Sequence, residues 1–170
     1  MSVCEAVAVN EDWERRTAEA WAAIDNHDAE KFRALIGTLA DELPADSAIA
    51  DFERACAFDS TGHSDRAVPL YRKALERGLT GERRRRAVIQ LSSSLRNIGN
   101  PQESVDLLTA EMNAGSDRLD DAIRAVLALA LTDLGREREA VSLAVGALAR
   151  HLPRYQRSMA DYARLLIEKE

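Results

Sequence analysis

The chain has 170 residues and a mass of 18.8 kDa, which is the size of one ordinary domain. Its 29 alanines and 20 leucines far outnumber its 8 glycines and 4 prolines, so helix formers dominate. A hydrophobic share of 46% excludes disorder, and the lack of any apolar run of about 18 residues excludes a membrane span. The net charge of -6 disfavours a general attraction to nucleic-acid phosphates or anionic lipid.

The first residues and the cysteines indicate a cytoplasmic protein. We expect residues 1–10 to form a flexible tail, because Glu5 interrupts their short apolar stretch and no basic residue precedes it, unlike in a signal peptide. Cys4 and Cys56 lack metal-ligand spacing. The two thiols could pair, but a disulfide framework needs more of them.

Residues 11–25 open the first of several similar segments, each with a short break near its middle. The separations between the central residues of successive breaks are 35, 37 and 36 residues. After each break an apolar stripe of helical periodicity follows at offsets 5, 8, 9, 12 and 13, interrupted only by Glu111. The central residues are His27, Gly62, Gly99 and Gly135, and leucine stands eight positions later at Leu35, Leu70, Leu107 and Leu143.

A second helix precedes each break. Small residues occupy the position seven residues before the central one, where two helices could approach closely: Ala20, Ala55, Ser92 and Ala128. The chain is therefore a repeating pair of helices, A and B. We predict helices at 11–25, 28–42, 46–60, 64–77, 82–97, 101–113, 117–134, 137–151 and 154–168.

Local signals agree with these helix ends. Asn100 and Pro101 suit an N-cap and a first helical position, and Glu103 stands where a capping-box acid reaches back. Gly78 and Gly115 are predicted to be left-handed C-cap residues. Two prolines follow predicted helix ends, where they interrupt no helical hydrogen bond: Pro44 and Pro153.

The second repeat carries the clearest family pattern, with small, aromatic and turn residues in a fixed order: Ala55, Phe58, Gly62, Ala67, Tyr71 and Ala74. This pattern resembles the tetratricopeptide repeat over residues 11–152. The aromatic usual early in helix A is replaced by Arg16, Asp51, Val88 and Arg124. The resemblance implies an all-α, right-handed α-α superhelix, a TPR-like solenoid of four repeats at about 11–45, 46–80, 81–115 and 117–152.

The last segment, residues 153–170, is predicted to be a capping helix. Tyr155, Met159, Tyr162 and Leu166 are spaced by 4, 3 and 4 residues, which gives one apolar stripe. We expect this stripe to cover the apolar face of the last repeat. The alternative is that the helix packs against a second copy of the protein.

In repeats of this family the A helices line a concave groove, so the resemblance implies which residues face a partner. The groove would be apolar near Trp21, Ile49 and Phe52 and basic around Arg86 and Arg96, which suits an amphipathic helix or an extended peptide with an acidic group. Trp21 is the first candidate for an anchor; alternatively, Trp13 and Trp21 pack within the first helix pair. The groove set is Glu14, Thr17, Trp21, Asp25, Ile49, Phe52, Cys56, Asp59, Arg86, Ile89, Gln90, Ser93, Arg96, Asn97, Leu129 and Asp133.

Some members of this family bind the C-terminal carboxylate of chaperones through a clamp of basic and amide side chains. Of the matching positions here, only Arg86 has suitable chemistry, and Glu53 would repel a carboxylate. The chaperone function is therefore disfavoured. The matching positions are Thr17, Trp21, Glu53, Arg86 and Gln90.

The run Arg83 to Arg86 is the strongest local charge feature. Successive helical residues rotate by about 100°, so the four side chains splay around the helix instead of forming one patch. They also stand near a helix start, where positive charge opposes the macrodipole. A solvated helix end or salt bridges to the acidic second repeat would explain the run, and nucleic acid or an acidic peptide is the alternative.

Catalytic motifs are lacking. His27, His63 and His151 stand at turns or helix ends, and the sequence has no HExxH, CxxC or glycine-rich phosphate loop. We therefore expect no enzymatic activity, cofactor or metal. The leading hypothesis is a protein-interaction module that holds a peptide in its groove, the second is a homodimer formed through terminal helices, and nucleic-acid binding follows.

Overall fold

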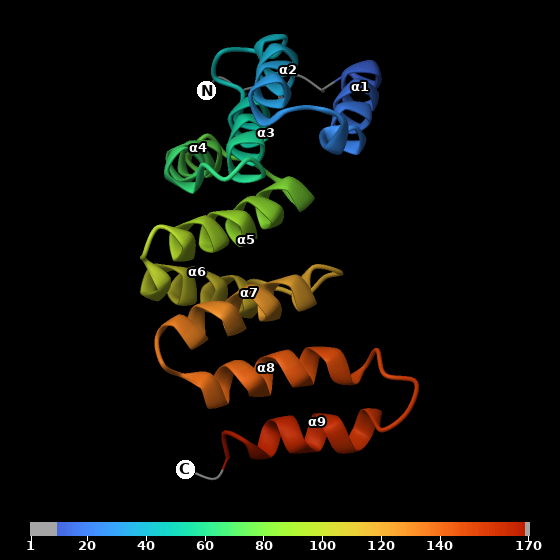
Figure 1. Cartoon of the computed structure of the whole chain (residues 1–170), viewed down its shortest axis with the longest axis vertical. Helices are drawn as coiled ribbons and strands as arrows, with labels where there is room; N and C mark the ends of the chain where they lie inside the picture. Colours follow the sequence, from blue (N-terminus) through green and yellow to red (C-terminus); the bar gives the residue numbers. More distant parts are fainter. Residues whose placement is uncertain (1–9, 169–170) are drawn as a thin grey trace, which may run out of the picture.

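The computed structural model describes residues 10–168, and within them every regular element is helical (Figure 1). Residues 1–9 of the predicted tail, which include Cys4, lie outside the described residues. The elements are α1 Glu11–Ala22, the short 3-10 helix η1 Ile24–Asn26, α2 Ala29–Asp41, α3 Ala48–Asp59, α4 Ser64–Glu76, α5 Gly81–Asn97, α6 Pro101–Ala114, α7 Asp120–Asp133, α8 Glu137–Ala149 and α9 Gln156–Leu165.

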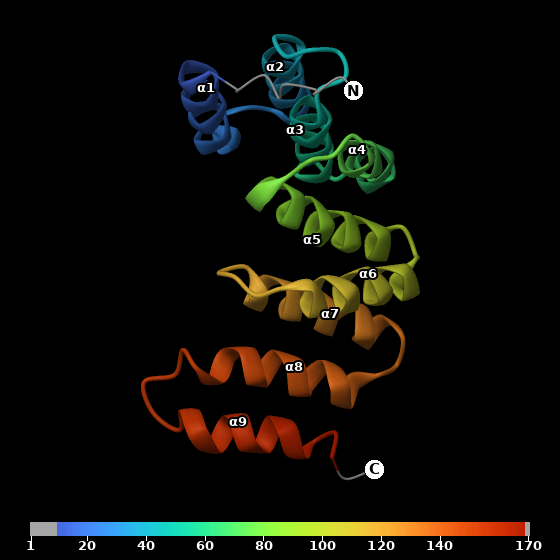
Figure 2. The same cartoon turned by 180° about the vertical axis from the view of Figure 1, so that it is seen from behind.

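The helices stack in chain order from α1 at one end of an elongated molecule to α9 at the other, as both views show (Figures 1 and 2). Each helix packs against the next, and α5 also lies against α3 and α7. Every predicted helix is present, with ends that differ by a few residues. The prediction of an all-helical, TPR-like solenoid is confirmed.

Glycine makes the turn between the two helices of repeats two to four. Gly62, Gly99 and Gly135 are left-handed, with φ of 81°, 86° and 72°. In each turn the N–H after the glycine donates to the carbonyl five residues back, at 2.9 Å: His63 to Phe58, Asn100 to Leu95 and Arg136 to Leu131. The first turn has His27 instead, with φ of -118°, and there α1 ends in η1. This break therefore has a different geometry from the other three.

Two of the predicted helix-end signals are wrong. Asn100 and Pro101 do occupy the predicted N-cap and first helical position, but the Asn100 side chain makes no capping hydrogen bond, and Glu103 instead accepts from Arg72 at 2.6 Å. Gly115 has φ of 170°, which is extended backbone, whereas Gly78 is left-handed as predicted, with φ of 81°.

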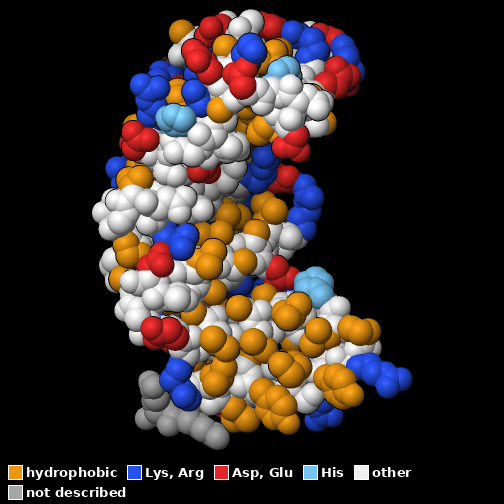
Figure 3. Space-filling model, viewed as in Figure 1, with side chains coloured by type: hydrophobic (Ala, Val, Ile, Leu, Met, Phe, Trp, Pro, Cys, Tyr) orange, Lys and Arg blue, Asp and Glu red, His pale blue; other side chains and the backbone are white. Residues whose placement is uncertain are grey.

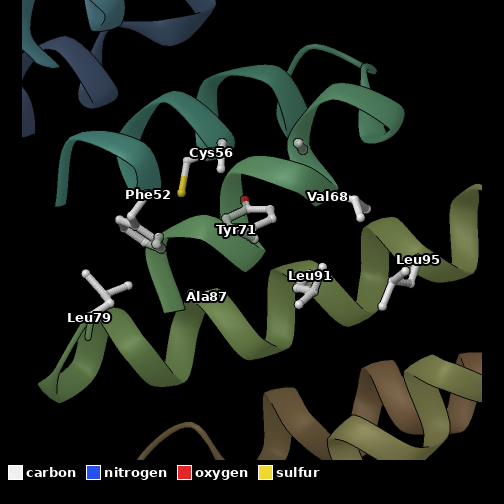
Figure 4. Close-up of a cluster of buried hydrophobic side chains, with 11 residues drawn as sticks. Phe52, Cys56, Val68, Tyr71, Leu79, Ala87, Leu91 and Leu95 are labelled. Carbon is white, nitrogen blue, oxygen red and sulfur yellow. The ribbon is translucent and has the colours of Figure 1, made fainter. Parts of the chain in front are cut away.

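The core lies between successive helix pairs. In the cluster of Figure 4, Phe52 and Cys56 of α3 meet Tyr71 of α4 and Leu91 and Leu95 of α5. Alanines fill the positions of closest helix approach, and those in this cluster are fully buried: Ala55, Ala67, Ala74 and Ala87. The high alanine content thus serves close helix packing.

Candidate functional site

The predicted groove residues fall into three groups of different accessibility. Those buried are Thr17, Phe52, Cys56 and Ile89. Those half-buried are Glu14, Trp21, Ile49, Asp59, Gln90, Ser93 and Arg96. Those exposed are Asp25, Arg86, Asn97, Leu129 and Asp133.

The N-terminal part of this surface is tied together by a polar network that we call the clasp: Glu14, Trp21, Glu53 and Arg83. Arg83 of α5 forms an ion pair with Glu14 of α1 at 2.5 Å and with Glu53 of α3 at 3.3 Å. The Trp21 indole N–H donates to Glu53 at 2.8 Å. Burial raises the pKa of Glu53, and the Trp21 and Arg83 contacts partly oppose that rise. Glu14 and Trp21, which the sequence assigned to partner binding, are therefore bonded within the protein.

The two tryptophans both take part in packing. Trp13 is buried and its indole N–H donates to the Leu39 carbonyl at 2.7 Å, which confirms the packing alternative for Trp13. Trp21 is half-buried and meets the Phe32 ring of α2 edge-on at 5.0 Å. Because it also bonds to Glu53, Trp21 joins α1 to both α2 and α3.

Phe52 does not offer an apolar surface in the groove, and that prediction is wrong. Its ring is 0% exposed, packs 6.2 Å from Tyr71 and lies beneath the Arg86 guanidinium, 5.3 Å from the ring centroid. Cys56 is likewise buried, donates to Gln90 at 3.4 Å, and has its thiol pKa raised to about 12 by burial. Large apolar side chains such as Phe52 are usually buried in the core, and this chain has few of them.

Polar groups further along the predicted groove pair with each other. Asp59 accepts from Ser94 at 2.8 Å and from Tyr71 at 3.3 Å, and burial raises the pKa of its carboxyl. Arg96 of α5 forms an ion pair with Asp133 of α7 at 2.5 Å. These bonds hold neighbouring helices in register.

Three of the four consecutive arginines are bound to carboxylates, and the salt-bridge explanation is confirmed. Arg84 contacts Glu111 at 2.6 Å, and the nearly buried Arg85 contacts Glu111, Asp117 and Asp120 at 3.2, 3.0 and 2.6 Å. The partners extend beyond the acidic second repeat to α1, α6 and the start of α7. Glu111, which interrupts the apolar stripe in the sequence, is thus an interior ion-pair residue.

Arg86 differs from its three neighbours. It is exposed, and within residues 10–168 it has no carboxylate at ion-pair distance. Its guanidinium rests on the Phe52 ring, which orients a cation without neutralising it.

Arg86 belongs to an accessible row that we call the α5–α7 surface: Arg86, Gln90, Ser93 and Asn97 of α5 with Leu129 of α7. The α5 members recur at three- and four-residue spacing, so they share one face of that helix. Leu129 on the adjacent helix is 51% exposed. The surface thus combines an exposed cation that has no ion pair among the described residues, polar side chains and an apolar one.

Other kinds of site find no support in the part of the chain that is described. No group of three or more His, Cys, Asp or Glu side chains is placed to hold a metal ion there. Nor is any helix there long and apolar enough to cross a membrane.

Comparison with protein families matches the tetratrico peptide repeat over residues 48–166. The match spans α3 to the end of α9 and covers more than half of the chain. Searches of curated proteins and of solved structures found no match. The matched segment contains all three glycine turns and the α5–α7 surface. The chain therefore belongs to the tetratricopeptide repeat family.

Proposed function

We propose that this protein is an interaction module that binds a peptide segment of a partner protein along the α5–α7 surface. Repeats of this family typically serve as protein–protein interaction scaffolds. The observation that carries the proposal is Arg86, an exposed cation that rests on Phe52 and has no carboxylate at ion-pair distance among the described residues. Glu53 and Glu82 act on it only through longer-range electrostatics. A carboxylate from a partner would form a charge-assisted hydrogen bond with it.

The chemistry of the row defines the peptide that fits. An acidic residue would meet Arg86, and an apolar residue further along the peptide would pack on Leu129. The clasp already bonds Glu14, Trp21 and Glu53 internally. We therefore centre the proposed site on α5 and α7 and not on Trp21.

The proposal is tested with a displayed library of random peptides of about 12 residues, selected on the wild-type protein. We expect the enriched peptides to combine Asp or Glu with a large apolar residue. Binding of a synthetic enriched peptide, measured by calorimetry, should weaken at least about tenfold in Arg86→Glu and in Leu129→Glu.

Arg66→Glu is the matched control, because Arg66 is another exposed arginine that rests on an aromatic ring, at 5.4 Å from the centroid of Phe58. It should bind like wild type. Failure to enrich any peptide, or equal loss in all three variants, would overturn the proposal.

Nucleic-acid binding is disfavoured because Arg83, Arg84 and Arg85 already pair with carboxylates. A phosphate-binding role would require affinity that falls steeply with salt. The expected cytoplasmic location stays a prediction.

A further inference from the structure

The B helices of the second and third repeats each bury an apolar face against the next A helix. Val68 and Tyr71 of α4 lie in one core cluster with Leu91 of α5 (Figure 4). Val105 and Leu108 of α6 lie in another with residues of α7. These residues stand six and nine positions after their turn glycines, so the same face of helix B carries the stack each time.

The equivalent face of α8 is open. Val141, Ala144 and Leu148 stand six, nine and thirteen positions after Gly135, and we call them the open stacking face. Val141 is 48% and Leu148 55% exposed. The fourth repeat therefore presents to solvent a surface that the preceding repeats bury.

The reason is that α9 packs on a different side of α8, which corrects the predicted cap. Ser142 donates to the Ala163 carbonyl at 2.7 Å, and a Cβ on Gly146 would lie 3.9 Å from the Ala163 Cβ. Positions matching Ser142 and Gly146 in α4 and α6 are exposed: Pro69, Lys73, Asp106 and Ala110. Tyr155, at the start of α9, is the one left-handed non-glycine residue described, with φ of 67°.

The sequence of α9 nevertheless has the pattern of an A helix. Ala163 follows Ala128 by 35 residues, which makes Tyr162 the counterpart of the buried Leu127. Tyr162 is 62% exposed. Two stacking surfaces are thus exposed: the side of α9 that carries Tyr162, and the open stacking face of α8.

We infer that two copies of the protein pair by placing α9 of each against the open stacking face of the other. A reciprocal contact of this kind uses the same two surfaces on both copies and closes as a twofold dimer. It pairs an A-type helix with the surface that A helices cover elsewhere in the chain.

The size of the surface favours a second copy. Within residues 10–168, six of the eight exposed large apolar residues lie on α8, on α9 or directly beside α9, and Figure 3 shows apolar side chains gathered over this end. Together they expose on the order of 700 Å², close to what each partner gives to a standard interface.

Sedimentation velocity between roughly 1 and 200 µM protein tests the pairing. Wild type should sediment as a dimer at the upper end. Leu148→Glu and Tyr162→Lys should each raise the dissociation constant of the dimer at least about tenfold. Ile98→Glu is the control, because Ile98 is 41% exposed but lies at the end of α5. All variants should keep the helical circular dichroism of wild type.

Mixing the two disruptive variants gives the sharpest test. The mixed dimer regains one native contact, and in the other contact the introduced carboxylate of Leu148→Glu faces the introduced ammonium of Tyr162→Lys. It should therefore form more readily than the dimer of either variant alone. A wild-type monomer throughout the range would overturn the inference, as would a dimer that resists Leu148→Glu or that Ile98→Glu disrupts equally. Neither disruptive variant changes Arg86, so this test is independent of peptide binding.

Discussion

Replacing Glu111 with glutamine should destabilise the protein by about 2 to 3 kcal/mol, because it removes a charge that two arginines share. The Glu111 side chain is 4% exposed and lies 2.6 Å from Arg84 and 3.2 Å from Arg85. Removing one partner of a buried ion pair costs about 3 to 5 kcal/mol. We expect less here, because Arg84 is half-exposed and Arg85 keeps Asp117 and Asp120.

Urea unfolding followed by far-ultraviolet circular dichroism measures this loss without the charge screening that guanidinium would add. Glu103→Gln provides the control. Glu103 is a carboxylate on the same helix, its ion pair with Arg72 spans 2.6 Å, and both partners are about half-exposed. Its loss should cost at most about 0.5 kcal/mol. Equal effects of the two substitutions would refute the reasoning that burial gives the Glu111 cluster its strength.

Three further substitutions test the turns and the clasp. Gly99→Ala should destabilise the protein by about 1 kcal/mol, because Gly99 has φ of 86°. Gly37→Ala in the middle of α2 should stabilise the protein by about as much, because alanine favours the helix. Urea midpoints that moved in the same direction would contradict this. Burial raises the pKa of Glu53, so its contribution to stability is full below the ordinary carboxyl pKa and is lost as pH rises through the raised value. Glu53→Gln keeps an acceptor for the Trp21 N–H but removes the titrating carboxyl. The free energy of unfolding, measured in urea from about pH 4 to 7, should therefore fall less with pH in this variant than in wild type. The same pH dependence in both proteins would contradict this.

The solenoid could be predicted from the sequence because its turns and faces obey local rules. Gly62, Gly99 and Gly135 stand where the chain needs a left-handed residue, which few others adopt readily. Leucine eight residues later marks the same face of each B helix. These signals depend only on neighbouring residues along the chain, so they can be recognised without knowing how the helices pack.

The accessibility of the groove residues could not be predicted in the same way. Phe52 and Arg86 both occupy groove positions of the family, yet Phe52 packs into the core and Arg86 lies over it. The burial of Phe52 involves a contact with Tyr71 on another helix, which the local sequence does not specify. Helical periodicity also gives an apolar side to α9 without saying which side of α8 it meets.

The ion pair of Glu14 with Arg83 joins residues 69 positions apart, and α2, α3 and α4 lie between them in the chain. In most repeat arrays each unit contacts only its neighbours, so a terminal unit can open while the next stays intact. Here the opening of α1 breaks bonds to both α3 and α5. We therefore expect the opening of α1 to loosen α3 and α5 as well, whereas α9 is joined chiefly to α8.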